Sequence, residues 1–270
     1  MLLAIISDIH ANLDALRATL DDIAAHGADR ILCLGDIVGY NTEADACIAL
    51  LRQHDAFCIA GNHDRAVTGQ ITTEGFPHVA AKAVAWTREH LTAQARGYLA
   101  ALPSKAVFEG KLVMVHGALH PQVGSEMVRL DNDAERRLSF AALAAHPSGA
   151  RICAFGHTHQ AGIFECHGDL VRQIDCDNAV LRDDACYLIN PGTVGQPRSS
   201  DRRATYMLFD TARGYLLLRR VDYDFAAALA KTRRAGLAPP LSFLPASIRE
   251  PLKRGVRAAG IYDMVRGVMR

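Results

Sequence analysis

Short apolar runs alternate with helical patterns along the first sixty residues of the chain. Leu2–Ile6 is a continuous apolar run typical of a buried strand, and the apolar positions from Leu13 to Ile23 then recur at helical spacing. The next expected elements are a strand at Ile31–Leu34, a helix at Glu43–His54 and a strand at Phe57–Ala60. This strand–helix–strand order predicts a parallel sheet that is covered by helices.

The pattern changes after residue 65 and then returns to strands. Residues 76–102 form a long Ala-rich helical stretch, so we expect a helical cap insertion at about 65–103 over the edge of the sheet. The later expected strands are Leu112–Val115, Ile152–Phe155, Gly162–Cys166, Leu170–Ile174, Tyr187–Ile189 and a hairpin of Thr205–Phe209 with Tyr215–Arg220. So many late strands predict a second sheet, and therefore an α/β fold: a four-layer αββα sandwich of two mixed β-sheets flanked by helices.

Composition and charge divide the chain into a body and a tail. The 270 residues are 50% hydrophobic and 22% charged, which excludes general disorder. The net charge of +1 conceals an asymmetry, because residues 211–270 carry 12 Lys and Arg against 4 Asp and Glu. Since Pro239-Pro240 interrupts the chain, we expect a domain at 1–240 and a basic helical tail at 241–270.

Two interpretations of the tail stay open. It docks on the body or on a neighbouring subunit of a homo-oligomer, or it binds an anionic surface such as nucleic acid. We favour docking, because Gly255 and Gly260 weaken the helix.

Cysteine usage and the N-terminus bear on the compartment. The seven cysteines are odd in number and contain no C-x-x-C pair, which is typical of reduced thiols. The apolar N-terminal run is too short for a signal sequence, and no run approaches the ~20 residues of a membrane helix. We therefore expect a cytoplasmic protein without a transmembrane segment.

Five short segments place polar, metal-binding side chains directly after apolar strands. They are Asp8-Ile9-His10, Gly35-Asp36, Gly61-Asn62-His63-Asp64, His116-Gly117 and Gly156-His157-Thr158-His159. Because loops at the carboxyl ends of parallel strands converge, we expect these segments to meet in one site.

The residue types in these segments suit a pair of metal ions. Side chains two positions apart on an extended segment point the same way, so Asp8 and His10 can bind one ion together. Carboxylate, imidazole and amide ligands without a thiolate favour Mn, Fe, Zn, Co or Ni over calcium. The ligands suffice for two ions that share one carboxylate, and Asp36, alone in its loop, is the natural bridge.

The five segments together resemble the motifs of the calcineurin-like metallophosphoesterase superfamily. Residues 35–40 and 190–198 are also similar to segments of its small bacterial phosphodiesterase/phosphatase branch. The resemblance implies a first divalent ion held by Asp8, His10, Asp36 and His159, and a second held by Asp36, Asn62, His116 and His157. Manganese is the ion that we expect first, with Fe, Zn, Ni or Co as the others.

The resemblance also implies the chemistry of the site. A hydroxide bridging the two ions would attack phosphorus, and His63, oriented by Asp64, would act as general acid toward the leaving group. The implied enzyme is a phosphodiesterase or phosphatase that acts on a small-molecule phosphate ester.

Three further residues are candidates for substrate binding, each with a structural alternative. Asn12 contacts phosphate or caps a helix, Tyr40 stacks on a base or fills its loop, and Arg198 binds a phosphate oxygen or pairs with an acid. The segment Asn190-Pro191-Gly192 is expected to buttress the metal loops.

Other functions remain as alternatives. A dinucleoside polyphosphate hydrolase or a protein phosphatase would use the same ligands. A nuclease is disfavoured, because an acidic body repels a polyanion. A non-catalytic scaffold on the same fold is disfavoured by the complete ligand set. The choice between monoester and diester is left open.

Overall fold

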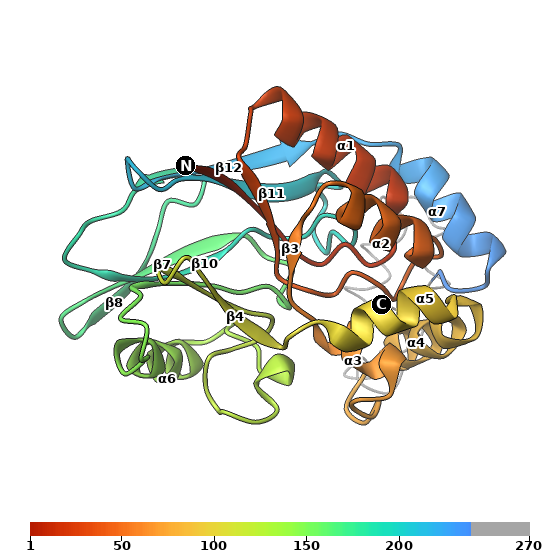
Figure 1. Ribbon diagram of the computed structural model, residues 1–270, viewed down its shortest axis with the longest axis horizontal. Helices are drawn as coiled ribbons and strands as arrows, with labels where there is room; N and C mark the ends of the chain where they lie inside the picture. Colours follow the sequence, from red (N-terminus) through yellow and green to blue (C-terminus); the bar gives the residue numbers. More distant parts are fainter. Residues whose placement is uncertain (239–270) are drawn as a thin grey trace, which may run out of the picture.

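Two stacked β-sheets with helices on their outer sides form the protein (Figure 1). The computed structural model describes residues 1–238. The first sheet has the order β3-β2-β1-β11-β12-β9, and the second the order β4-β5-β6-β10-β7-β8. The strands of the first sheet are β1 (Leu2–Ile6), β2 (Arg30–Cys33), β3 (Phe57–Cys58), β9 (Asn178–Val180), β11 (Ala204–Asp210) and β12 (Tyr215–Val221). The second contains β4 (Lys105–Phe108), β5 (Leu112–Val115), β6 (Ile152–Ala154), β7 (Gly162–His167), β8 (Leu170–Ile174) and β10 (Cys186–Asn190).

Both sheets are mixed. In the first, β1, β2 and β3 run parallel, whereas β11, β12 and β9 add antiparallel pairs. In the second, β5, β6 and β10 run parallel, and the remaining pairs are antiparallel. The carboxyl ends of the parallel strands therefore lie at one edge of each sheet, which confirms the predicted arrangement of two mixed sheets.

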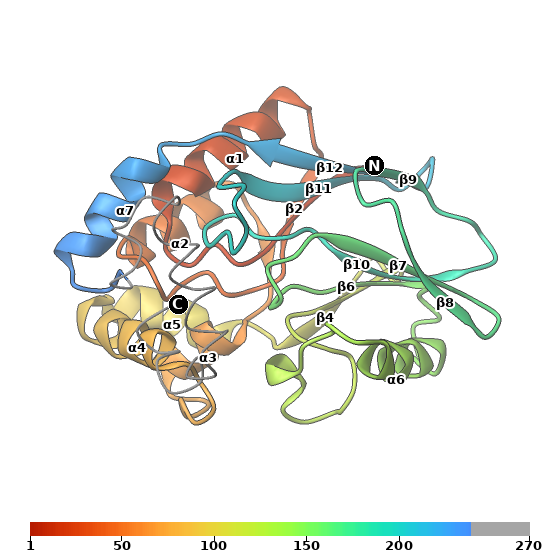
Figure 2. The same ribbon diagram turned by 180° about the vertical axis from the view of Figure 1, so that it is seen from behind.

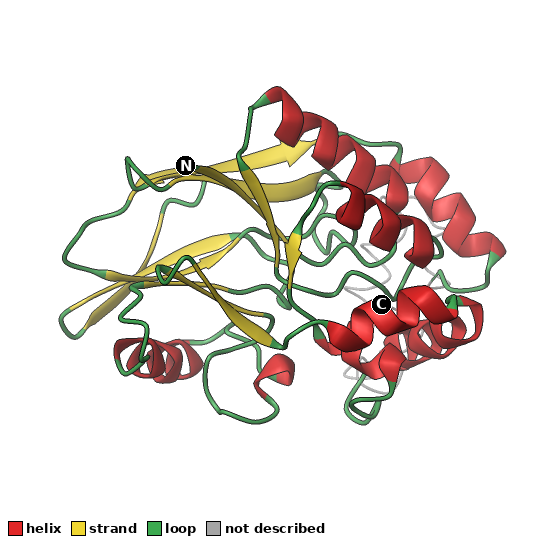
Figure 3. Ribbon diagram, in the orientation of Figure 1, coloured by secondary structure: helices red, strands yellow, loops and turns green. Residues whose placement is uncertain are grey.

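Helices cover the outer faces, as Figures 2 and 3 show. Helices α1 (Leu13–Ala25), α2 (Ala44–Gln53) and α7 (Phe225–Arg234) lie on the side of the first sheet, and α6 (Asp133–Ala144) lies on the second. Helices α3 (Asn62–Thr68), α4 (His78–His90) and α5 (Ala93–Ala101) pack together beside β3. No helix of the described residues is long and apolar enough to cross a membrane.

Three apolar layers hold these elements together. The layer between the sheets includes Ile5, Tyr187 and Met207, all at most 1% exposed. A second layer lies under α1 and α2, and a third lies under α6. Each fully buried Leu or Ile contributes about 1.5–3 kcal/mol relative to exposure, so these layers are the main source of stability.

The helical region after β3 is divided more finely than the sequence pattern indicated. Residues 76–102 contain two helices, because Leu91 leaves the helical conformation and Thr92 caps the next helix. The Thr92 side chain accepts a hydrogen bond from Ala95 N at 3.3 Å. Whether residues 65–103 form a separate cap stays a prediction.

Several elements had no counterpart in the sequence analysis: α6, α7, β4 and β9. Strands β4 and β9 contain no buried residue, unlike the equally short β5 and β6, so they lack the continuous apolar run of a buried strand. The predicted basic tail at 241–270 lies outside the described residues.

Candidate metal centre

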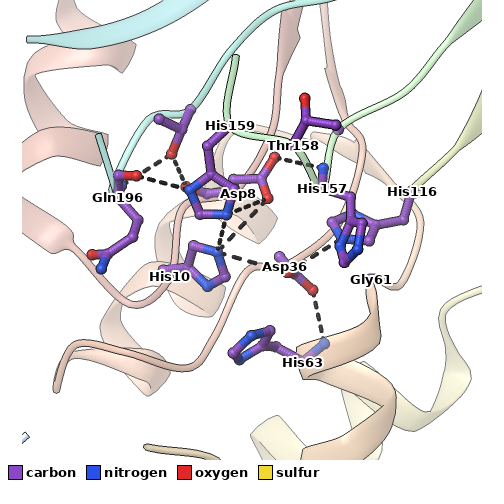
Figure 4. A network of polar contacts seen from close by, with 12 residues as sticks. Asp8, His10, Asp36, Gly61, His63, His116, His157, Thr158, His159 and Gln196 are labelled. Atoms are coloured by element: carbon purple, nitrogen blue, oxygen red, sulfur yellow. Dashed lines mark hydrogen bonds and ion pairs between the residues drawn. The ribbon is translucent and has the colours of Figure 1, made fainter. Parts of the chain in front are cut away.

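Five loops from the two sheets converge on one buried cluster of acids and imidazoles (Figure 4). The loops follow β1, β2 and β3 in the first sheet and β5 and β6 in the second. They bring together Asp8, His10, Asp36, Asn62, His63, His116, His157 and His159, of which only His157 is more than 6% exposed. The predicted convergence at strand ends is therefore present in the structure.

The cluster divides into groups with the spacing of metal ligands. Ligand atoms of Asp8, His10 and His159 lie within 4.8 Å of one another, and so do those of Asp36, His116 and His157. A third set with the same spacing, His10, Asp36 and His63, shares two members with these groups. Asp36 Oδ2 lies 3.6 Å from His10 Nε2 and 3.2 Å from His116 Nε2. One carboxylate oxygen thus faces both groups, which is the arrangement that a bridging ligand needs.

Backbone carbonyls set the orientation of three imidazoles. The Nδ1 atoms of His10, His116 and His159 lie 3.1, 2.9 and 2.8 Å from carbonyl oxygens. The acceptors are Val38 O, Leu34 O and Gln196 O. Because a carbonyl can only accept, Nδ1 carries a proton in each ring, and Nε2 is the nitrogen that points into the cluster.

The inward-facing atoms repel one another unless a positive charge lies among them. His10 Nε2 and His159 Nε2 are 3.2 Å apart, and His159 Nε2 is also 3.2 Å from Asp8 Oδ1. Three buried atoms, Asp8 Oδ1, Asn62 Oδ1 and His116 Nε2, have no hydrogen-bond partner in residues 1–238. Since a buried polar atom without a partner is costly, this donor set fits bound cations.

The backbone of the ligand loops is held in an unusual conformation. Asp8, His10, Asp36, His157 and His159 all have φ between 50° and 62°, the left-handed region that non-glycine residues rarely adopt. A Cβ on Gly61 would lie 2.2 Å from Asp36 Oδ1, so only glycine fits beneath this carboxylate. Left-handed residues of this kind cluster at functional sites, where the surrounding structure over-determines them.

Electrostatics keep the carboxylates ionised. Burial raises the pKa of Asp8 and of Asp36, but neighbouring histidines outweigh it and lower both values, chiefly His159 for Asp8 and His116 for Asp36. Burial lowers the pKa of His157 to about 3. Burial also opposes a charge on His116, yet Asp36 and Asp8 raise its pKa to about 9. In the protein without cations, a proton on His116 therefore offsets part of the negative charge of the two acids.

The chain matches a known family over most of its length. Residues 1–214 match the calcineurin-like phosphoesterase superfamily domain. The chain belongs to this family. It is accordingly a phosphoric ester hydrolase of a metal-dependent family, and the acid and imidazole groups described above are its candidate metal-binding residues.

This phosphoesterase is similar in sequence to two other proteins and in fold to a third. A metallophosphoesterase from Sphaerobacter thermophilus is 34% identical, with a TM-score of 0.72 over 88% of this chain and 95% of that one. An uncharacterized protein from Methanocaldococcus jannaschii is 32% identical over 85% of this chain and 91% of its own length. A hypothetical protein from Pyrococcus horikoshii, 18% identical, shares the fold with a TM-score of 0.69 over 88% of this chain and 94% of that one.

Asp64 does not orient His63 in this phosphoesterase, contrary to the expectation from sequence. Its carboxylate accepts hydrogen bonds from Gly61 N at 2.9 Å, Val38 N at 3.1 Å and Ile37 N at 3.3 Å. Asp64 instead joins the loops after β2 and β3, because three backbone amides converge on one carboxylate. Burial and the charge of Asp36 raise its pKa to about 7, against the effect of these amides.

Rings position His63 instead. Its ring centroid lies 4.8 Å from those of His10 and Tyr40 and 5.2 Å from that of Phe76. Its backbone N donates to Asp36 Oδ1 at 2.8 Å, which ties the residue to the proposed bridging ligand. Burial lowers the pKa of His63 to about 3 in the protein without cations or substrate, so the ring is neutral there.

The three substrate candidates have different surroundings. Asn12 caps α1, accepting from Ala15 N at 3.1 Å, and donates to Gly195 O at 2.9 Å. Both ends of its amide are engaged, so the helix-capping alternative is present in the structure, and the phosphate contact stays a prediction. Tyr40 and Arg198 do lie at the cluster. The Tyr40 ring is 4.7 Å from that of His10, and Arg198 Nη2 is 3.0 Å from His159 Nε2.

Supporting residues were found only in part from sequence. Asn190 was expected to buttress the loops, and it donates to Gly156 O at 2.9 Å and to Thr158 Oγ1 at 3.0 Å. The carbonyls that orient the imidazoles were missed, because every residue has a carbonyl and the sequence does not distinguish these three. Phe76 was missed because it is distant in sequence from every metal motif.

Proposed function

We propose that this phosphoesterase hydrolyses small-molecule phosphate mono- or diesters at a dinuclear metal centre, with manganese as the first candidate ion. The first ion is assigned to Asp8, His10, Asp36 and His159, and the second to Asp36, Asn62, His116 and His157. The observation that carries the proposal is the set of buried, inward-facing oxygen and nitrogen atoms that lack partners within the described chain.

The ions, when bound, supply Lewis-acid chemistry that activates water and neutralises charge on phosphoryl oxygens. The chain supplies the geometry. One oxygen of Asp36 faces His10 of the first ligand group and His116 of the second, so this carboxylate would fix the distance between the two ion positions. Arg198 offers a guanidinium beside His159 for a phosphoryl oxygen that is not coordinated.

His63 is assigned to the leaving-group side of the site. It is the one buried histidine of the cluster that the proposed ligand set does not use, and its Nδ1 has no hydrogen-bond partner in residues 1–238. A ring N–H of His63 can donate to the departing oxygen as the ester bond breaks, as a hydrogen bond or as a full proton transfer.

A metal and substrate panel tests the proposal. The metal-free protein is loaded in turn with Mn, Zn, Fe, Ni, Co and Mg and assayed on aryl and alkyl phosphate mono- and diesters, dinucleoside polyphosphates and a phosphopeptide. We expect hydrolysis of the small esters with manganese, loss of activity on chelation and recovery when manganese is returned. A loaded protein that is inert on every ester would refute the proposed function and favour a scaffold.

Metal analysis of Asp36→Ala tests the bridging assignment separately. Because the carboxylate faces both groups, we expect both ions to be lost. The exposed Asp21→Ala serves as the matched control and should keep both. If Asp36→Ala retained one firmly bound ion, Asp36 would not be the bridge.

A further inference from the structure

Helix α7 lies beyond the part of the chain that matches the family domain, yet it reaches the candidate metal loops. The family match ends at residue 214, and α7 begins at Phe225. Thr232, on the buried side of α7, is 6% exposed. Its hydroxyl lies 2.7 Å from Asn41 Oδ1, which belongs to the loop after Asp36.

Asn41 in turn holds the backbone of His10. Asn41 Nδ2 donates to His10 O at 2.8 Å, and Asn41 N lies 3.2 Å from the same oxygen. The backbone carbonyl of His10 can only accept a hydrogen bond. The NH₂ end of the Asn41 side-chain amide therefore faces His10, and its Oδ1 faces α7. The Thr232 hydroxyl is the donor to Oδ1 at 2.7 Å, and Ala228 O, one turn earlier in α7, lies 3.0 Å from the same hydroxyl as the alternative acceptor. The shorter contact gives the relay its direction, from Thr232 through Asn41 to His10.

The residues at the end of the relay are the strained ones. His10 has φ 50°, Ala11 has φ 55° and Tyr40, which immediately precedes Asn41, has φ 59°. A left-handed conformation of this kind is unfavourable for a residue with a side chain and persists only when its neighbours hold it. The Tyr40 ring also lies against both His10 and His63, so a shift of Asn41 would move a proposed ligand and the proposed leaving-group residue together.

Charged contacts keep α7 in register with these loops. Lys231 Nζ lies 2.8 Å from Asp14 Oδ2 and 2.9 Å from Glu43 Oε2. Asp14 is in the first turn of α1 and Glu43 is the N-cap residue of α2, the two helices that follow the loops carrying Asp8 and Asp36. One lysine therefore fixes α7 to the start of both helices, and Thr232 is the neighbouring residue.

We propose that α7 determines the conformation of the metal-binding loops. Thr232 and Asn41 are the positioning residues, and they hold His10 and Tyr40 in the conformation that cation binding requires. The inference rests on the proposed function for its catalytic consequence, but its consequence for metal affinity is independent of the substrate. It predicts that a residue outside the family domain controls a ligand at the centre of that domain.

The test uses the full chain with Thr232→Val, which keeps the shape of the side chain and removes the hydroxyl, and Thr232→Ser, which restores it. Manganese affinity of the metal-free protein is measured by calorimetry, and kcat and KM are measured on an aryl phosphodiester. For Thr232→Val we expect affinity weakened by about 3- to 10-fold, the effect of one hydrogen bond, and a lower kcat with KM changed less. Thr232→Ser should return both to within about twofold of the wild type.

A matched control separates positioning from general stabilisation. Lys82 Nζ donates to Gly236 O at 2.9 Å, so Lys82→Met loosens the end of the same segment without touching Asn41. It should leave manganese affinity unchanged. If Thr232→Val lowered only the melting temperature, with wild-type manganese affinity and kcat, α7 would be merely structural and the inference wrong. A wild-type protein that binds manganese but hydrolyses nothing would refute the proposed function, while the affinity comparison would still decide this inference.

Discussion

The His63 ring sits among three other rings, those of His10, Tyr40 and Phe76. Aromatic contacts of this kind fix the plane of an imidazole without assigning its protons, because ring packing offers no acceptor. An Asp beside the ring would have held a proton on one nitrogen. The His63 ring can therefore donate a proton from its N–H to a bound substrate. This suits an acid that serves esters with different leaving groups.

Replacement of His63 should affect poor leaving groups most. For His63→Ala we expect kcat to fall by about 10²–10⁴-fold on an alkyl ester and much less on a nitrophenyl ester, whose phenolate departs without a proton. Metal content should stay near the wild-type value. His90→Ala, which removes an exposed ring stacked on Trp86, is the control and should change neither rate. An equal loss on both esters, together with lost metal, would make His63 a ligand instead.

At the scale of elements, the sequence predicted the strands that carry the motifs because their residues form continuous apolar runs, and the first helices because their apolar positions recur at helical spacing. The strand at 2–6 and the helix from Leu13 were expected and are present as β1 and α1. The loops between them depended on contacts that no local pattern shows. From the sequence, for example, Asp64 was expected to hydrogen-bond to its neighbour His63. In the structure its carboxylate instead accepts hydrogen bonds from three backbone amides of two loops.

The loop at Gly39 should be intolerant of a side chain. Gly39 has φ +90°, and a Cβ there would lie 2.3 Å from His63 Nδ1. We expect Gly39→Ala to displace His63 and lower kcat on alkyl esters. Gly27→Ala is the matched control, since Gly27 has φ +66° but open space around it, so it should cost about 1–2 kcal/mol of stability from backbone strain alone. Urea unfolding and kcat of the two variants check this. Equal kcat in both would show that His63 does not depend on the loop.

At the scale of the whole molecule, hydrogen bonds to Asp22, a partly buried residue of α1, join this helix to strands β11 and β12 of the first sheet. Asp22 accepts two hydrogen bonds from Arg219, Nη2 to Oδ1 at 2.9 Å and Nε to Oδ2 at 3.1 Å. Tyr206 OH donates to Asp22 Oδ2 at 2.7 Å. These bonds, with Arg219 first, lower the pKa of Asp22 below its usual 3.8 despite partial burial. No sequence pattern predicted this contact, because nearly two hundred residues separate the partners.

Loss of the Asp22 charge should destabilise the fold in a pH-dependent way. The depressed pKa means that the contribution is present above about pH 4 and is lost as the pH falls through the folded-state value. For Asp22→Asn we expect a loss of about 1–2 kcal/mol at pH 7, which shrinks toward zero below pH 4. The neighbouring exposed Asp21→Asn should show no such dependence. Urea unfolding between pH 3 and pH 7 measures both, and a constant loss across that range would contradict the explanation.

Each of the two proposed ion positions draws its ligands from both sheets. Asp8 and His10 follow β1 of the first sheet, whereas His159 follows β6 of the second, and the other group is divided in the same way. A growing chain that ends before residue 159 therefore contains no complete first group, whatever part of it has already folded. Cations that bind such a site favour only conformations in which the sheets are packed together, by mass action. The concentration of available metal would thus affect two quantities, the turnover rate of the enzyme and the fraction of the chain that stays folded.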